Sequence, residues 1–141
     1  LTTVGSDCFL MAYAHVPHDA VIEDSVTIAN SVQIGGHSHL MRGCNIGLSA
    51  CIHQFTVIGS YAMVGMGSVV GKHILPFNTF AGSGPKRLGV NEVGLKRIGC
   101  DADKIERVSQ WSVKFLATNE GDLPDEDLAS EVARFKTLTK K

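Results

Sequence analysis

The histidines of this sequence are its main candidates for chemistry, because six of them occur in 141 residues. His18 is followed directly by Asp19, a carboxylate that could orient the imidazole ring and stabilise its protonated form. Such a pair is typical of general acid–base catalysis. Imidazole is also the commonest metal ligand in proteins, so gathered histidines could instead hold a metal ion. The choice depends on which histidines the fold brings together.

The elements that would position these side chains are indicated by a six-residue repeat. Every sixth residue from Val4 to Val70 is Val, Ile or Leu, a run of twelve positions without an exception. The fifth residue of each hexapeptide is no larger than Val in eleven of the twelve, and Ile74 is the exception. No helix repeats every six residues, and a plain strand has a period of two. The pattern predicts a solenoid whose flat faces are one hexapeptide long, with the aliphatic side chains in a narrow core.

This repeat resembles that of the hexapeptide-repeat acyltransferases, which implies a left-handed parallel β-helix. The resemblance implies a triangular coil of about 18 residues, and therefore four coils over residues 1–75. Stacked coils would lie about 4.8 Å apart. We therefore expect a mainly β protein, a left-handed parallel β-helix followed by a small α-helical C-terminal segment.

The chain beyond the repeat is expected to change character twice. Residues 76–100 are rich in Gly and Pro and are predicted to form an irregular connecting loop. Residues 101–141 are predicted to form a C-terminal helical segment. Asp101 would cap a helix running to about Thr118, and Pro124 suits the first turn of a second helix.

With an 18-residue coil, most of the histidines fall on one edge of the solenoid. The residues of this column are His18, Gly36, His37, His53, Gln54 and His73, and His15 and His39 flank it. A polar column on a solenoid is typical of a binding face. The alternative is that imidazoles are simply tolerated at exposed corners.

Metal binding by this column is the first chemical alternative. Some left-handed β-helix trimers are zinc carbonic anhydrases, whose pattern resembles a His, a gap of about two coils and then His-x4-His. His18 and His53 have about that separation, but the residue five places after His53 is Ile58, which cannot bind zinc. Successive coils would also keep the imidazoles about 4.8 Å or more apart, whereas zinc ligands lie about 2.0–2.1 Å from the ion. We therefore expect no metal and no cofactor.

Several short motifs point to acid–base chemistry on a particular substrate class. They are His15-Val-Pro-His18-Asp19, Gly35-Gly-His37, Ile52-His-Gln-Phe55 and Asn91-Glu-Val-Gly-Leu-Lys-Arg97. Together they resemble the acyl-carrier-protein-dependent UDP-N-acetylglucosamine O-acyltransferases of lipid A synthesis, over residues 1–100. The resemblance implies an acyltransferase that moves a (3-hydroxy)acyl chain from acyl carrier protein to the 3-hydroxyl of the UDP-amino sugar. It also implies a homotrimer in which neighbouring subunits form each cleft.

The resemblance implies a role for each matching residue. His18 would be the general base, Asp19 would hold its tautomer, and the Gly36 N–H would bind the oxyanion of the tetrahedral intermediate. Substrate-binding roles are implied for His15, His37, His53, Gln54, Asn91 and Arg97. Met66 would lie at the far end of the acyl groove and shorten it, acting as a ruler for chain length, with packing at a subunit interface as the alternative.

Some residues depart from the family pattern. Val93 stands where the family commonly has an acidic residue, and Ile98 replaces a second basic residue after Arg97. The stretch 83–87 lacks the usual Asn-His, and His73 has no counterpart in the family. These departures keep open a related acyltransferase acting on another nucleotide amino sugar. A catalytically inactive trimeric scaffold is a third possibility, against which the His18–Asp19 pair argues.

Composition excludes other classes of protein. A formal net charge of −1 provides no general attraction to nucleic acid, and no apolar run is long enough to span a membrane. The four cysteines have no CxxC spacing, so we expect reduced thiols and a cytoplasmic protein. The sequence begins with Leu1 rather than Met, and we expect an N-terminally truncated chain.

Overall fold

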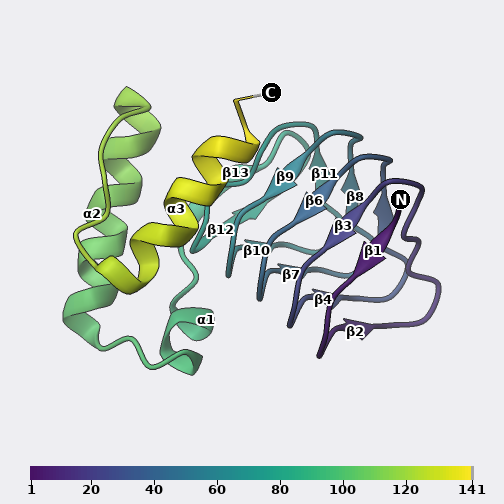
Figure 1. The fold of residues 1–141 in the computed structure, drawn as a ribbon, viewed down its shortest axis with the longest axis horizontal. Coiled ribbons are helices and arrows are strands. Elements are labelled where there is room, and N and C mark those ends of the chain that lie inside the picture. Colours follow the sequence, from purple (N-terminus) through teal and green to yellow (C-terminus); the bar gives the residue numbers. More distant parts are fainter. Residues whose placement is uncertain (141) are drawn as a thin grey trace.

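The chain winds into a triangular parallel β-helix with helices packed at one end. Figure 1 shows a computed structural model, which describes residues 1–140, with the coils stacked side by side and the N-terminus at the end remote from the helices. Each face of a coil is a two-residue strand, except that the third face of the first coil has only an isolated bridge at His15. The strands are β1 (Thr3–Val4), β2 (Phe9–Leu10), β3 (Val21–Ile22), β4 (Thr27–Ile28), β5 (Gln33–Ile34), β6 (His39–Leu40), β7 (Asn45–Ile46), β8 (Cys51–Ile52), β9 (Val57–Ile58), β10 (Met63–Val64) and β11 (Val69–Val70).

The strand register confirms the coil length expected from the resemblance. Three parallel sheets run along the solenoid, in the orders β1-β3-β6-β9, β2-β4-β7-β10 and β5-β8-β11, and we call them the first, second and third faces. Thr3 pairs with Val21 and Val21 pairs with His39, so one coil takes 18 residues. Every strand ends on the aliphatic residue of its hexapeptide, and from Ile22 to Val70 each of these side chains is at most 3% exposed. The six-residue repeat therefore arises because each strand contributes one aliphatic side chain to a continuous core.

The corners between faces are turned by left-handed residues. From Val4 to Val64, the third residue after each aliphatic position has a φ between +56° and +65°, even where its side chain is large, as at Asp19, His37 and Phe55. Such a conformation is uncommon for residues other than Gly, Asn and Asp, so the closed coil imposes it. Corner residues 18 apart in the sequence stack on one another as a result.

The fourth coil is two residues shorter than the others. Ile58 pairs with Ile74 and Met63 pairs with Thr79, a separation of 16 residues instead of 18. His73 therefore lies beside Val57, whose N–H donates to His73 Nδ1 at 3.0 Å. The expectation that His73 belongs to the histidine column is wrong, because the corner after Val70 is two residues shorter than the others and places His73 beside Val57.

Residues 76–100 are not an irregular loop. They contain β12 (Asn78–Ala81), β13 (Lys86–Val90) and α1 (Glu92–Arg97). β12 continues the second face by pairing in parallel with β10, and β13 pairs with β12 in antiparallel fashion. The exposed edge of β10 needs hydrogen-bond partners, and β12 supplies them. The Gly and Pro residues of this segment lie mainly in the turns between its strands and helix.

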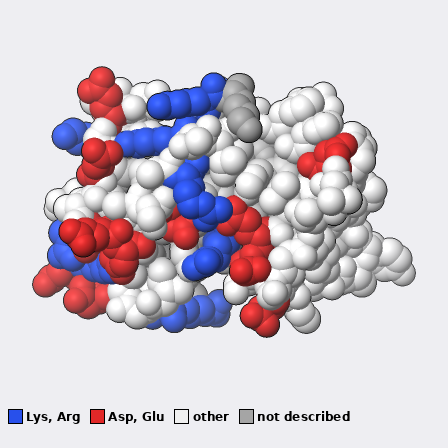
Figure 2. Space-filling view, in the orientation of Figure 1, with Lys and Arg blue, Asp and Glu red and all other residues white. Residues whose placement is uncertain are grey.

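The two expected C-terminal helices are present. They are α2 (Ala102–Thr118), capped by the Asp101 side chain on the Lys104 N–H at 2.8 Å, and α3 (Glu126–Leu138). None of the helices among residues 1–140 combines the length and apolarity needed to cross a membrane. The charged side chains gather over this helical end, whereas the visible face of the N-terminal coils is largely uncharged (Figure 2).

The attachment of α3 to the solenoid is ionic as well as apolar. Arg134 pairs with Glu23 of the second coil and, at 3.0 Å, with Glu131. Glu131 in turn accepts a hydrogen bond from Ser60 at 2.5 Å, and His39 Nε2 lies 2.6 Å from Glu23. This network fixes the helical end to the first face.

Candidate functional site

One corner of the solenoid gathers the histidines. We call this corner, which joins the third face to the first, the histidine edge: residues 17–19, 35–37 and 53–55. The bridge between His15 and Gln33 and the pairing of Gln33 with Cys51 hold these three segments in register. His18, Gly36 and Gln54 therefore form one stack, and Asp19, His37 and Phe55 form the adjacent stack. Because both stacks lie at an exposed corner, they are accessible without any opening of the core.

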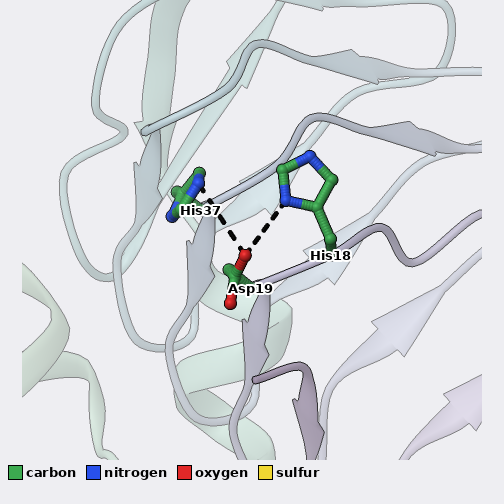
Figure 3. A group of neighbouring side chains, drawn as sticks. All are labelled: His18, Asp19 and His37. Atoms are coloured by element: carbon green, nitrogen blue, oxygen red, sulfur yellow. Dashed lines mark hydrogen bonds and ion pairs between the residues drawn. The ribbon is translucent and has the colours of Figure 1, made fainter.

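His18 and Asp19 form a hydrogen-bonded pair at this edge. His18 Nδ1 lies 3.1 Å from Asp19 Oδ2, and Figure 3 shows both rings of the cluster directed at that one carboxylate oxygen. The carboxyl group of an aspartate has an ordinary pKa of about 3.9, well below neutral pH. Asp19 is therefore ionised at neutral pH and can stabilise a protonated imidazole.

His37 is the third member of the cluster. Its Nε2 lies 3.9 Å from Asp19 Oδ2, and its ring meets the His18 ring edge-on with the centroids 5.3 Å apart. On its other side it stacks on Phe55, with centroids 4.7 Å apart and planes only 9° from parallel. The His37 ring is thus held between two neighbours, whereas the His18 side chain is 74% exposed.

Gly36 leaves the space that the His18 ring occupies. A Cβ placed on Gly36 would lie 2.7 Å from His18 Cε1 and 2.8 Å from Nε2. The Gly36 carbonyl accepts a hydrogen bond from the Phe55 N–H at 3.0 Å, while within residues 1–140 its own N–H donates to no protein acceptor. The unused N–H of Gly36 and the Nε2 side of the His18 ring therefore lie next to each other.

Two other predicted residues, His53 and Gln54, also lie on the histidine edge, and His15 lies beside it on the third face. All three are exposed, and His53 Nδ1 contacts the Gln54 carbonyl oxygen at 3.0 Å. Gln54 borders a hollow of about 500 Å³, whose lining is Gln54, Phe55, Thr56, Gly71, Lys72 and His73. We did not predict Phe55 or Lys72 as site residues, although each lies 18 residues after a residue that we did predict.

Asn91 and Arg97 lie at a different corner of the chain. They line a groove of about 560 Å³ beside the second face, together with Tyr61, Val93 and Ile98. Asn91 caps α1 through its bond from the Gly94 N–H at 3.1 Å, and its amide also donates to the Tyr61 carbonyl at 2.8 Å. Arg97 ends α1. This groove is therefore separated from the histidine edge within one chain.

Met66 lies at the third corner, between the second and third faces. It is 76% exposed and follows Val64 by two residues, as His18 follows Val16. The two residues thus have equivalent places on adjacent edges, which agrees with the coil arithmetic.

One group of side chains could hold a metal ion. His18, Asp19 and His37 each offer one ligand atom, and these atoms all lie within 4.8 Å of one another. Ile58, at the position where a carbonic-anhydrase pattern needs a third histidine, is completely buried in the core. The arrangement is therefore a carboxylate between two imidazoles, not a three-histidine site.

Comparisons with known proteins agree with this geometry. The family model "Bacterial transferase hexapeptide (six repeats)" matches residues 1–36. The chain is 38% identical over 110 residues, 78% of its length, to an acyl-[acyl-carrier-protein]–UDP-N-acetylglucosamine O-acyltransferase from Alkalilimnicola ehrlichii, of which it covers 43%. It is 35% identical over 95% of its length to the protein of the same name from Synechocystis, of which it covers 48%. The chain thus spans about half the length of these relatives.

Solved structures show the same relationship. LpxA from Acinetobacter baumannii matches 95% of the chain with a TM-score of 0.82 at 24% identity, and the match covers 57% of that protein. The UDP-N-acetylglucosamine O-acyltransferase of Moraxella catarrhalis matches 97% of the chain with a TM-score of 0.77 at 31% identity, and the match covers 52% of that protein. These matches confirm the left-handed β-helix that the hexapeptide pattern led us to expect.

Proposed function

Because this chain is homologous over most of its length to acyl-[acyl-carrier-protein]–UDP-N-acetylglucosamine O-acyltransferases, we propose that it carries the acyl-transfer site of such an enzyme. Its donor would be a (3-hydroxy)acyl thioester of acyl carrier protein, and its acceptor the 3-hydroxyl of UDP-N-acetylglucosamine, as in lipid A synthesis. The observation that carries the proposal is the hydrogen-bonded His18–Asp19 pair with Gly36 against the imidazole ring.

The geometry suits a general-base reaction in which His18, Asp19 and Gly36 have different roles. Asp19 accepts a hydrogen bond from the Nδ1–H of His18, which leaves the Nε2 lone pair free as the base. His18 Nε2 takes the proton from the sugar hydroxyl, and the hydroxyl oxygen bonds to the carbonyl carbon of the thioester. The imidazolium, stabilised by the ionised Asp19, then gives that proton to the departing thiolate. The unused N–H of Gly36 suits the oxyanion that forms between the two steps.

The separation of the histidine edge from the Asn91–Arg97 groove supports a homotrimer. A single chain presents the base at one corner and the Asn91–Arg97 groove at another, so a neighbouring subunit would bring the second beside the first. The outward-facing residue of every two-residue strand, from Thr3 to Val69, carries no Lys, Arg, Asp or Glu. Depletion of charge is typical of the buried core of an interface. Arg97 would then bind the diphosphate of the nucleotide through its forked donors.

The acceptor could be another nucleotide amino sugar, and the composition of the groove favours this alternative. Val93 is 60% exposed and Ile98 is 41% exposed in the groove, and both stand where we expected charged residues of the family. Two fewer charges would relax recognition of the nucleotide or the sugar, without any change to the His18–Asp19 pair.

The test is acyl transfer by the purified chain from hydroxyacyl-acyl carrier protein to a panel of UDP-amino sugars. The His18→Ala variant should lose about 10²–10⁴-fold in turnover, the usual contribution of a general base. Its thermal melting should be unchanged, because an exposed corner side chain contributes little to the core. Lys114→Gln on α2, remote from the histidine edge, is the matched control. Near-normal turnover of His18→Ala would show that His18 is not the base.

A further inference from the structure

We propose that His18, Asp19 and His37 form a binding site for a divalent transition-metal ion such as Zn²⁺, and that the bound ion blocks acyl transfer. The binding site stands on the geometry of the three side chains alone. The inhibition rests in addition on the proposed function.

The separations of the three ligand atoms suit a tetrahedral ion. Ligands that lie about 2.0–2.2 Å from zinc at tetrahedral angles are about 3.3–3.5 Å from one another. The two measured separations from Asp19 Oδ2, 3.1 Å to His18 Nδ1 and 3.9 Å to His37 Nε2, lie on either side of that value. The separation between Asp19 Oδ2 and His37 Nε2 must shorten slightly, and the ligand atoms of the two histidines, which lie within 4.8 Å of each other, must also approach. The exposed His18 side chain can make that movement by rotation about its own bonds.

The surroundings keep the other two ligands in place. Asp19 and His37 have φ values of +57° and +59°, so the corner backbone fixes the direction in which each side chain leaves the chain. Phe55 stacks on the His37 ring and limits its rotation.

The donor set also selects the kind of ion. Two imidazoles and one carboxylate suit zinc and its neighbours among the first-row metals better than Mg²⁺ or Ca²⁺, which prefer oxygen ligands. The exposed side of the cluster leaves room for a water molecule as the fourth ligand.

The consequence for catalysis follows from the atom that the ion would occupy. Binding to His18 Nδ1 replaces the proton that Asp19 accepts, and it turns the ring away from Gly36 as the ligands close. The positive charge of the ion also makes Nε2 a weaker base. The metal would therefore inhibit the reaction.

The test of the site is isothermal titration of the purified chain with Zn²⁺, together with the visible absorption of bound Co²⁺. We expect one ion per chain, and an affinity reduced at least about tenfold in each of His18→Ala, Asp19→Asn and His37→Ala. His15→Ala and His53→Ala, whose imidazoles lie outside the cluster, should bind as tightly as the unsubstituted chain. Circular dichroism would show that each variant is folded. No binding, or equal losses in the two control variants, would overturn the proposal.

The inhibition is tested separately, by measuring acyl transfer with and without Zn²⁺ and then with a chelator. We expect Zn²⁺ to abolish turnover and the chelator to restore it. Full turnover at a Zn²⁺ concentration that saturates the site in the titration would overturn the inhibition. Absence of transfer in metal-free protein would count against the proposed function and leave the result of the titration unaffected.

Discussion

Adding a single methyl group at Gly36 should disable the site without unfolding the protein. An alanine Cβ would stand 2.7 Å from His18 Cε1 and 2.8 Å from Nε2, whereas ordinary carbon contacts are about 3.5–4.0 Å. The Gly36 backbone is not left-handed, so alanine can adopt it without strain. The conflict must then be relieved by the imidazole, which is free to move because most of its surface is exposed.

The distances give the size of the effect. Relief of the contact displaces the ring by about 1 Å, which lengthens the 3.1 Å contact with Asp19 and moves the base away from the hydroxyl it must deprotonate. A displacement of about 1 Å costs on the order of 10²-fold in rate, or about 2.7 kcal/mol of transition-state stabilisation. The N–H of residue 36 remains in the alanine variant, so the loss reports on the position of His18 and not on the oxyanion donor.

The assay compares kcat/KM and thermal melting of Gly36→Ala with those of Gly71→Ala. Gly71 is a fair control because its backbone is not left-handed either, and an added Cβ there meets no atom within 4 Å among the described residues. We expect a large loss of kcat/KM in Gly36→Ala, none in Gly71→Ala, and melting temperatures within a few degrees of each other. Normal kcat/KM in Gly36→Ala would refute the placement of His18 as the base.

Three further outcomes are expected from the solenoid and its helical end. Burial raises the pKa of Glu23, but hydrogen bonds from His39 and Arg134 outweigh it and lower the value from 4.5 to about 2. Its contribution to stability, at most about 3 kcal/mol, is therefore present above pH 4.5 and lost as the pH falls toward 2. Melting temperatures should drop more steeply over that range than in Glu23→Gln, and parallel curves would contradict this. Sedimentation should show a trimer, and a stable monomer at micromolar concentration would exclude one. Met66→Gly should shift preference toward longer acyl donors, since a Met side chain fills several methylenes of a groove; an unchanged profile across a ladder of thioesters would show that Met66 is not the ruler.

Most of the solenoid was predictable because its core imposes a strict rule on the sequence. Each coil must bury one aliphatic side chain per face, and this requirement repeats every six residues wherever the coils are regular. The six-residue spacing of the aliphatic residues fails where the coil changes length. One residue of the sequence indicates this change. Ile74 is too large for the fifth place of its hexapeptide because it occupies the aliphatic place instead, paired with Ile58. The misplacement of His73 follows from that one change.

The stacking of Asp19, His37 and Phe55 was only partly predictable. The 18-residue step places all three at one corner. Local preference gave no support for left-handed backbone at His37 or Phe55, because such side chains rarely adopt it. Closure of the coil overrides that preference, which is a property of the whole turn and not of any short motif.

The separation between core and corner explains how such a scaffold can carry a site. The aliphatic residues that stabilise the coils point inward, whereas the corner residues two and three places later point away from the core and contribute little to it. Side chains at the histidine edge can therefore change without a change of fold, and Gly36 shows the limit of this freedom, since its missing side chain leaves room for a neighbour's ring. One chain places His18, the Arg97 groove and Met66 on different edges. If all three serve the proposed reaction, the complete site needs edges from more than one subunit, and the homotrimer that we propose would supply them with a single sequence.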